Sequence, residues 1–234
     1  MLISVEGLDG VGKSSLVDRI SKELQMSIIA KPIKSILELN SSQANKIKEK
    51  IYSKYSSNVQ ALYYLLGYLS TLEDGKKHDY IFDRGFLSTY YFSYCNENSH
   101  LFDFFANEYG FPDLTILLYA SIEKRIKRIQ MRDNQDKDLQ KNRIYVHNYE
   151  KMFEAINKYN IPHIAINTEN LTQKETCDLI LEILNLWKLD GEKRNYILNN
   201  YSIYNLSENE KLSYQNQIES LINYPPNQKK YIRK

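Results

Sequence analysis

The sequence predicts an α/β fold in which a parallel β-sheet is flanked by helices. Strand-like and helix-like segments alternate along the chain, which is typical of proteins built from repeated β–α units. A glycine-rich loop lies between the first predicted strand and the first predicted helix. The length of 234 residues and the 42% share of hydrophobic residues fit one such domain with a sizeable core.

The predicted strands are short apolar runs that precede polar or turn-forming residues. They are expected at residues 2–5, 27–30, 79–82, 114–119 and 163–166.

The predicted helices carry apolar residues at intervals of three and four. From residue 13 the apolar stripe is Leu16, Val17, Ile20 and Leu24; after the capping residue Ser121 it is Ile122, Ile126 and Ile129. Further helices are expected over residues 59–72, from residue 86, up to residue 153 and over 172–187, with residues 40–54 forming an exposed lysine-rich helix or loop.

These elements predict a conventional domain over residues 1–187. Residues 188–234 differ, since they are rich in Asn, Tyr and Lys and hold one amphipathic stretch near residues 206–222. We therefore expect a C-terminal helical extension whose role the sequence does not indicate.

The composition excludes several classes of protein. A net charge of +2 argues against binding nucleic acid or a membrane through bulk charge. Cys95 and Cys177 are too few for a disulfide framework, and the four histidines show no metal-ligand spacing. The start of the chain lacks the pattern of a signal peptide, and no apolar stretch approaches the roughly 20 residues that span a bilayer. We expect a reduced, cytoplasmic, soluble protein.

The strongest motif is a complete G-x-x-x-x-G-K-[ST] phosphate loop that starts at Gly7 and ends at Ser14. Its glycines allow successive backbone N–H groups to point at anionic oxygens, and the following helix adds partial positive charge. Lys13 can bridge the β- and γ-phosphates of ATP, and the Ser14 hydroxyl can ligate Mg²⁺. The predicted ATP-binding residues are Gly7, Gly10, Val11, Gly12, Lys13, Ser14 and Ser15.

Two further features favour a kinase among the proteins with such a loop. Asp83 and Arg84 follow a strand, so Asp83 could hold Mg²⁺ and Arg84 could clamp an acceptor phosphate; the alternative is a plain surface ion pair. Arg125, Arg128 and Arg132 recur at helical spacing before a charged segment, as expected of a lid, although a solvated helix would look alike. The guanine-binding Asn-Lys-x-Asp motif of GTPases follows no strand.

Together these residues resemble the thymidylate kinase family. The opening from Glu6 to Ser14 is similar to the family's E-G-x-D-G-x-G-K-[ST], and Asp83, Arg84 and Ser88 resemble its D-R-Y-x-x-S motif. Residues 112–115 resemble its P-D-L-T strand entry, and Arg132 with residues 136–137 falls where its lid would be. The resemblance implies the P-loop kinase fold with a lid segment, a homodimer, ATP as donor and Mg²⁺ as cofactor.

The resemblance also implies roles for individual residues. Asp9 would lie near the acceptor sugar and the magnesium shell, and Arg84 would hold the acceptor phosphate. Arg132 and Lys137 would supply lid cations, as in members without an arginine in the loop, and residues 8–11 contain none. Thr89 and Phe92 would line the acceptor nucleoside, with Tyr63 or Tyr64 stacking on its base.

Three departures from the family pattern concern the acceptor. The arginine that reads thymine would stand four residues after the stacking aromatic residue, where this chain has Gly67 or Tyr68. The tyrosine of D-R-Y is Gly85, and the lid arginine is Lys137, which keeps the charge without the fork geometry. Losing a donor that reads the base relaxes or changes base choice.

The sequence therefore predicts phosphoryl transfer from Mg·ATP to a nucleoside monophosphate, with dTMP first. The alternatives are a nucleoside or other small-metabolite kinase, and a nucleotide-binding protein with little catalysis whose C-terminal extension binds a partner.

Overall fold

The protein was analysed as a computed structural model, which describes residues 1–30, 37–76, 78–133, 139 and 149–189. The predicted amphipathic stretch near residues 206–222 and most of the predicted lid lie outside these residues. Within the described part of the chain, no helix is both long and apolar enough to cross a membrane.

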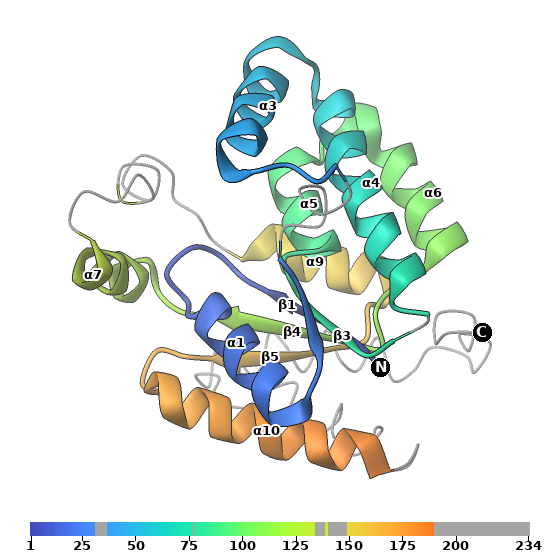
Figure 1. Cartoon of the computed structure of the whole chain (residues 1–234). Helices are drawn as coiled ribbons and strands as arrows, with labels where there is room; N and C mark the ends of the chain where they lie inside the picture. The colour runs from blue at the N-terminus through green and yellow to red at the C-terminus, as the bar shows by residue number, and fades with distance from the viewer. Residues whose placement is uncertain (31–36, 77, 134–138, 140–148, 190–234) are drawn as a thin grey trace.

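A five-stranded parallel sheet forms the centre of the described domain (Figure 1). Each strand pairs with its neighbours in parallel, and all five strands predicted from the sequence are confirmed. In spatial order the strands are β2 (Ser27–Ala30), β3 (Tyr80–Asp83), β1 (Leu2–Glu6), β4 (Leu114–Tyr119) and β5 (His163–Asn167).

Helices cover both faces of the sheet, and alternate strand residues form a core on each side (Figure 1). On one face, α1 (Lys13–Leu24) and α10 (Gln173–Leu189) pack on the sheet. On the other face lie α4 (Ser57–Asp74), α5 (Phe86–Ser93), α6 (Ser99–Tyr109) and α9 (Glu150–Tyr159). This arrangement confirms the predicted fold class.

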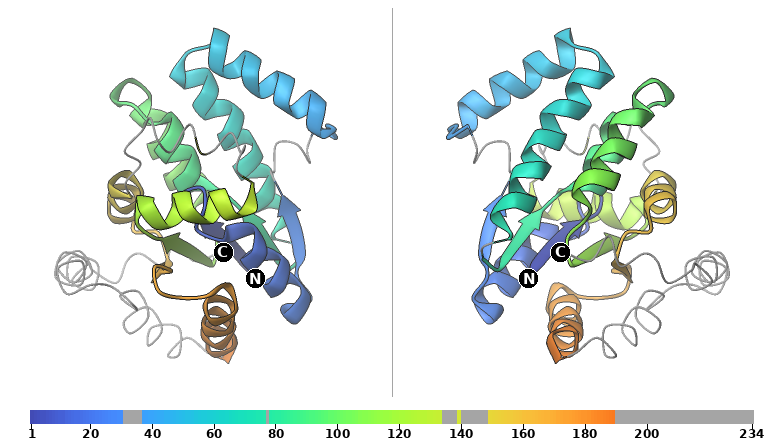
Figure 2. Two further views of the ribbon diagram at one scale, coloured as in Figure 1. Left: turned by 90° about the vertical axis from the view of Figure 1, so that its left-hand side faces the viewer. Right: turned by 90° about the vertical axis from the view of Figure 1, so that its right-hand side faces the viewer.

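Two of the helices in the described part of the chain do not pack on the faces of the sheet. Helix α3 (Ser41–Lys54) buries none of its residues and stands beyond α4, away from the sheet (Figures 1 and 2). Its N-terminal end is well defined, since Asn40 and Gln43 form a reciprocal capping box. Helix α7 (Ile122–Arg132) follows β4, and Ser121 caps it by accepting a hydrogen bond from the Lys124 N–H, as predicted.

The buried face of α7 differs in part from the predicted apolar stripe. Ile129 is buried, Ile122 and Ile126 are half-buried, and Arg125 is buried as well. A periodicity argument assigns arginine to solvent, so it missed that this guanidinium is taken into the protein. The short 3-10 turn η1 (Asn96–Asn98) and α6 were also not separated from the helix expected after residue 86.

The sheet register brings the predicted site residues together. Val5 pairs with Asp83, and Glu6 pairs with Leu117, so the carboxyl ends of β1, β3 and β4 meet at one edge. The phosphate loop leaves β1 at this edge, and Arg84 follows β3 beside it. In an open parallel sheet, this edge is where ligands bind.

Candidate active site

The phosphate loop curls tightly between β1 and α1, and close packing requires two of its glycines. Gly7 and Gly10 have φ values of 136° and 88°, which side chains rarely allow. A Cβ atom on Gly7 would collide with the carbonyl oxygen of Leu118, and one on Gly10 would lie 2.7 Å from that of Arg125. The loop is therefore held against the end of β4 and the first turn of α7.

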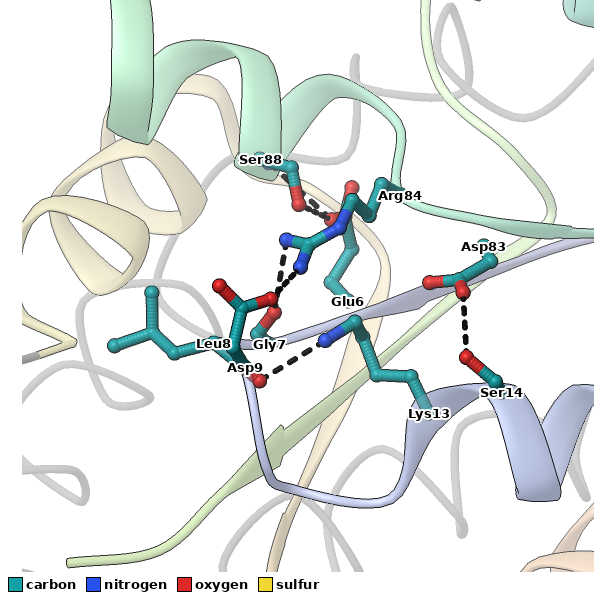
Figure 3. A network of polar contacts seen from close by, with 9 residues as sticks. All are labelled: Glu6, Gly7, Leu8, Asp9, Lys13, Ser14, Asp83, Arg84 and Ser88. Carbon is teal, nitrogen blue, oxygen red and sulfur yellow. Dashed lines mark hydrogen bonds and ion pairs between the residues drawn. The ribbon is translucent and has the colours of Figure 1, made fainter. Parts of the chain in front are cut away.

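Lys13 lies in the floor of the loop and is 6% exposed. Its Nζ donates a hydrogen bond of 2.9 Å to the carbonyl oxygen of Leu8 (Figure 3). Burial, and then the nearby Arg84 cation, lower the pKa of Lys13 to about 7, although the neighbouring carboxylates oppose this effect. An anionic phosphate beside Lys13 would favour its charged form, so this position is suited to a polyphosphate.

Ser14 and Asp83 meet across the gap between α1 and β3. The Ser14 hydroxyl donates a hydrogen bond of 3.1 Å to Asp83 Oδ2 (Figure 3). The other carboxylate oxygen, Asp83 Oδ1, is buried and has no hydrogen-bond partner within the described residues. A buried carboxylate oxygen next to a hydroxyl fits Mg²⁺, which prefers oxygen ligands.

Arg84 is turned back over the phosphate loop by an uncommon backbone conformation. Its φ of 71° lies in the left-handed region, and its backbone N–H donates 3.0 Å to the Val5 carbonyl oxygen. The guanidinium then forms an ion pair with Asp9 and donates 3.4 Å to the Gly7 carbonyl oxygen (Figure 3). Burial opposes the charge of Arg84, but Asp9 and the other nearby carboxylates outweigh it and raise its pKa.

Glu6 and Ser88 belong to the same network, and the sequence analysis gave them no role. Glu6 is fully buried at the end of β1 and binds Ser88 in the first turn of α5 (Figure 3). Burial raises the pKa of Glu6, while its hydrogen bonds to Ser88 and Gly85 lower it. Two signals in the sequence mark them: an acidic residue stands directly before the first glycine of the loop, and a serine stands four residues after Arg84.

The loop opens into a cleft of about 1860 Å³. Pockets for one small ligand typically hold roughly 300–1,000 Å³, so this cleft has room for a donor and an acceptor together. Its walls come from the phosphate loop, α3, α4, α5, α7 and the start of α10. The structure brings nearly all described site residues predicted from the sequence into these walls: Asp9, Gly10, Val11, Gly12, Lys13, Ser14, Ser15, Tyr63, Tyr64, Asp83, Arg84, Thr89, Phe92 and Arg132, with Gly7 just behind them.

Aromatic side chains line the half of the cleft that is formed by α3, α4 and α5. The rings of Tyr63 and Tyr64 meet edge to face at 5.0 Å, and Tyr52 of α3 lies 6.2 Å from Tyr64. The Arg84 guanidinium lies 5.9 Å from the ring centre of Phe92, which is 44% exposed. A flat ligand could stack among these rings.

Tyr68 also lines the cleft, but its hydroxyl is bound inside the protein. It is 1% exposed, and its hydroxyl donates 2.9 Å to the Gly110 carbonyl oxygen. Its ring packs against Phe82 and Phe86 of the core. The one hydrogen that Tyr68 could offer to a base is therefore already used within the protein.

The three arginines of α7 have different environments. Arg125 is fully buried, 5.8 Å from the ring centre of Tyr149. Arg128 donates 2.9 Å to the Thr168 hydroxyl and also binds the carbonyl oxygens of Thr168 and Leu171, which ties α7 to the loop before α10. Arg132 is exposed at the end of the helix, and Lys137 lies outside the described residues.

This geometry defines a class of protein. A triphosphate cradled by the loop would direct its terminal phosphate toward the half of the cleft that holds Arg84 and the aromatic rings, as in P-loop phosphotransferases. The family follows from the sequence: the thymidylate kinase family matches residues 5–178, and the chain belongs to it. Kinases of this family use ATP as the phosphoryl donor.

Solved structures with the same fold include kinases of nucleotides and of nucleosides. Thymidylate kinase from Candida albicans is 17% identical, with a TM-score of 0.59 over 80% of this chain and 92% of that one. Thymidylate kinase from Ehrlichia chaffeensis is 14% identical, with a TM-score of 0.52 over 79% and 98% of the two chains. Deoxyadenosine kinase from M. mycoides, with dCMP and dCDP bound, is 26% identical, with a TM-score of 0.58 over 79% and 99%. No curated protein sequence matches the chain.

Proposed function

We propose that the protein transfers the γ-phosphoryl group of ATP to the phosphate of a nucleoside monophosphate, with dTMP as the acceptor and dTDP as the product. The observation that carries this proposal is Arg84. A left-handed backbone turn directs its guanidinium over the phosphate loop, in the same cleft as Lys13. A fixed, fork-shaped cation at this point suits the phosphate of an acceptor.

The chemistry requires positioning and charge stabilisation rather than a covalent intermediate. The backbone of residues 7–15 and Lys13 would hold the β- and γ-phosphates. Mg²⁺, held by Ser14 and Asp83, would neutralise charge on those phosphates. Arg84 would hold the attacking phosphate oxygen of the acceptor in line, and Arg132 with Lys137 would meet the charge that develops on the transferred group.

The base of the acceptor would stack against the rings of α4 and α5. Tyr63, Tyr64 and Phe92 supply aromatic faces, and Thr89 lines the same wall. Helix α4 holds no arginine or lysine, and the Tyr68 hydroxyl is bound to Gly110. We therefore expect thymine to be selected by the shape of the cleft and by tyrosine hydroxyls, with weaker discrimination between bases than a charged donor would provide.

One relative supports a second candidate, a deoxynucleoside kinase. The M. mycoides deoxyadenosine kinase is 26% identical to this chain, and 99% of its length is covered. In that case Arg84 would not hold an acceptor phosphate, and the acceptor hydroxyl would enter the cleft without one.

The deciding experiment measures ADP release from Mg·ATP with matched pairs of acceptors: dTMP and thymidine, dUMP and deoxyuridine, dCMP and deoxycytidine, dAMP and deoxyadenosine. A kcat/KM for dTMP above those of the other acceptors supports the proposal. Preference for the nucleoside in each pair would replace it by the second candidate.

Two expectations from the sequence stay predictions. They are a homodimer, which sedimentation or light scattering would test, and a cytoplasmic location.

A further inference from the structure

Glu6 makes four hydrogen bonds with the turn that follows Arg84. Its Oε1 accepts from the backbone N–H groups of Gly85 at 2.8 Å and Leu87 at 3.1 Å. Its Oε2 accepts from the backbone N–H of Ser88 at 3.2 Å and from the Ser88 hydroxyl at 2.5 Å. The side chain is 0% exposed, so these contacts are shielded from water.

Three of these donors are backbone N–H groups at the start of α5, which have no partner within the helix itself. The N-cap residue Gly85 has no side chain that could accept from them. A Cβ atom there would lie 2.5 Å from Phe82 Cε2, so a larger capping residue does not fit. The carboxylate of Glu6 therefore caps α5 from β1, where the helix dipole also favours a negative charge.

Hydrogen bonds connect Arg84, which precedes the capped turn, to the residues on both sides of Glu6. Glu6 directly precedes Gly7, whose carbonyl oxygen accepts from Arg84 Nη1 at 3.4 Å. Val5, directly before Glu6, accepts from the Arg84 backbone N–H at 3.0 Å. Arg84 has a φ of 71°, a strained conformation that persists where the surrounding structure fixes it. Contacts on both sides of Arg84 thus come from three consecutive residues of β1 and the loop.

We infer that Glu6 is a positioning residue that fixes Arg84 relative to the phosphate loop, so that donor and acceptor phosphates are held in one rigid frame. Glu6 acts through Ser88 and the first turn of α5, and it touches neither substrate because it is fully buried. The inference rests on the proposed function for its effect on catalysis, but its structural effect on Arg84 can be measured without any substrate.

Two substitutions test this role at different strengths. Ser88→Ala removes the shortest hydrogen bond to Glu6 and leaves the three backbone bonds. Glu6→Gln keeps the shape of the side chain but replaces one acceptor oxygen by an NH₂ donor, which then faces at least one backbone N–H and cannot accept from it. Ser88→Thr keeps a hydroxyl and serves as the rescue variant. Tyr159→Phe serves as the matched control. It removes a partly buried hydroxyl, away from the cleft, that donates a hydrogen bond of 2.8 Å to Asp103.

The first measurement is the ¹H–¹⁵N NMR signal of the Arg84 Nε–H group, assigned with Arg84→Lys. We expect this signal to shift or broaden in Ser88→Ala and Glu6→Gln, and to stay unchanged in Ser88→Thr and Tyr159→Phe. An unchanged Arg84 signal in the folded variants would overturn the inference. If Glu6→Gln does not fold, Ser88→Ala decides the question alone.

The second measurement separates the kinetic constants. We expect Ser88→Ala to raise the acceptor KM about tenfold, as the loss of a hydrogen bond to a charged group would, while the ATP KM changes less than about twofold. If Ser88→Ala lowers activity only as much as Tyr159→Phe does for the same fall in Tm, a positioning role is contradicted. If the wild type phosphorylates no nucleoside monophosphate, the proposed function fails, and the NMR result still decides the role of Glu6.

Discussion

Arg84 and Asp9 form an ion pair that joins the end of β3 to the middle of the phosphate loop. Both side chains are partly exposed, 32% for Arg84 and 24% for Asp9, so their attraction adds little to stability. Its consequence is orientation, because the pair holds the guanidinium over the loop. An anionic acceptor would share or replace Asp9 as the partner of Arg84.

This relationship leads to a prediction about the acceptor. Arg84→Ala should lower kcat/KM for nucleoside monophosphates by about 100-fold, because the cation that meets the acceptor phosphate is removed. The use of the matching unphosphorylated nucleosides should change far less. Arg84→Lys should lie between the two, since it keeps the charge and loses the fork. Equal losses for nucleotide and nucleoside acceptors would show that Arg84 does not hold the acceptor phosphate.

Lys13 leads to a prediction about the chemical step. Lys13→Ala should lower kcat by at least about 100-fold, because a buried cation beside the β- and γ-phosphates is lost. The rate of ADP release at saturating acceptor measures this effect. Lys22→Ala is the matched control, since Lys22 lies in the last turn of the same helix and is exposed. Near-normal turnover in Lys13→Ala would remove Lys13 from the catalytic machinery.

Asp83 leads to a prediction about the metal. Asp83→Asn should raise the Mg²⁺ concentration for half-maximal activity by about tenfold, because an amide replaces the carboxylate that faces the metal position. The activity of the variant should recover partly at high Mg²⁺. Asp178→Asn changes an exposed aspartate that pairs with Arg19 outside the cleft, and should leave the Mg²⁺ dependence unchanged. An unaltered dependence in Asp83→Asn would argue that Asp83 holds no metal.

His163 leads to a prediction about stability and pH. Burial in β5 lowers the pKa of His163 to about 4, while its hydrogen bond to Ile161 raises it. The unfolded chain, with a histidine pKa near 6.5, binds more protons between these values, so stability falls as pH decreases through this window. The shift corresponds to about 2 kcal/mol less stability at pH 5 than at pH 7.

Urea denaturation at pH 5, 6 and 7 measures this effect. Other groups also titrate in this range, so the wild type is compared with His163→Gln, which cannot take up the proton. The stability difference between the two proteins should change by about 2 kcal/mol in favour of the variant on going from pH 7 to pH 5. A constant difference would mean that His163 is protonated equally in the folded and unfolded states.

Sequence patterns predicted the phosphate loop and the strands around it, because each of these is formed by residues close together in the chain. The phosphate loop could be identified from Gly7, Gly10 and Lys13, since glycine is required where the backbone must enter the left-handed region. The five strands are short apolar runs, and their parallel order places Asp83 beside the loop. Ser14 and Asp83 were each predicted to hold Mg²⁺, and the observed strand order brings the Ser14 hydroxyl to 3.1 Å from Asp83 Oδ2.

The prediction failed where a side chain makes contacts that depend on distant residues. Arg125 was expected on the charged face of a lid helix, but it is buried near Tyr149. Tyr68 stands at one of the two positions where the family's thymine-reading arginine would be, and no pattern indicated that its hydroxyl binds Gly110 across the fold. The periodicity of a sequence predicts which face of a helix a side chain lies on. It does not predict which residue of another segment that side chain contacts.

The sequence by itself determined the α/β class, the phosphate loop and the family, because glycine placement and apolar periodicity act over a few neighbouring residues. Only the tertiary structure decided that Arg84 bends back over the loop toward Asp9, and that Glu6 caps α5 from a strand about 80 residues earlier in the chain. These two arrangements depend on the register of β1 and β3. Such pairing joins strands that lie about 80 residues apart in the chain, so it depends on how the whole sheet packs.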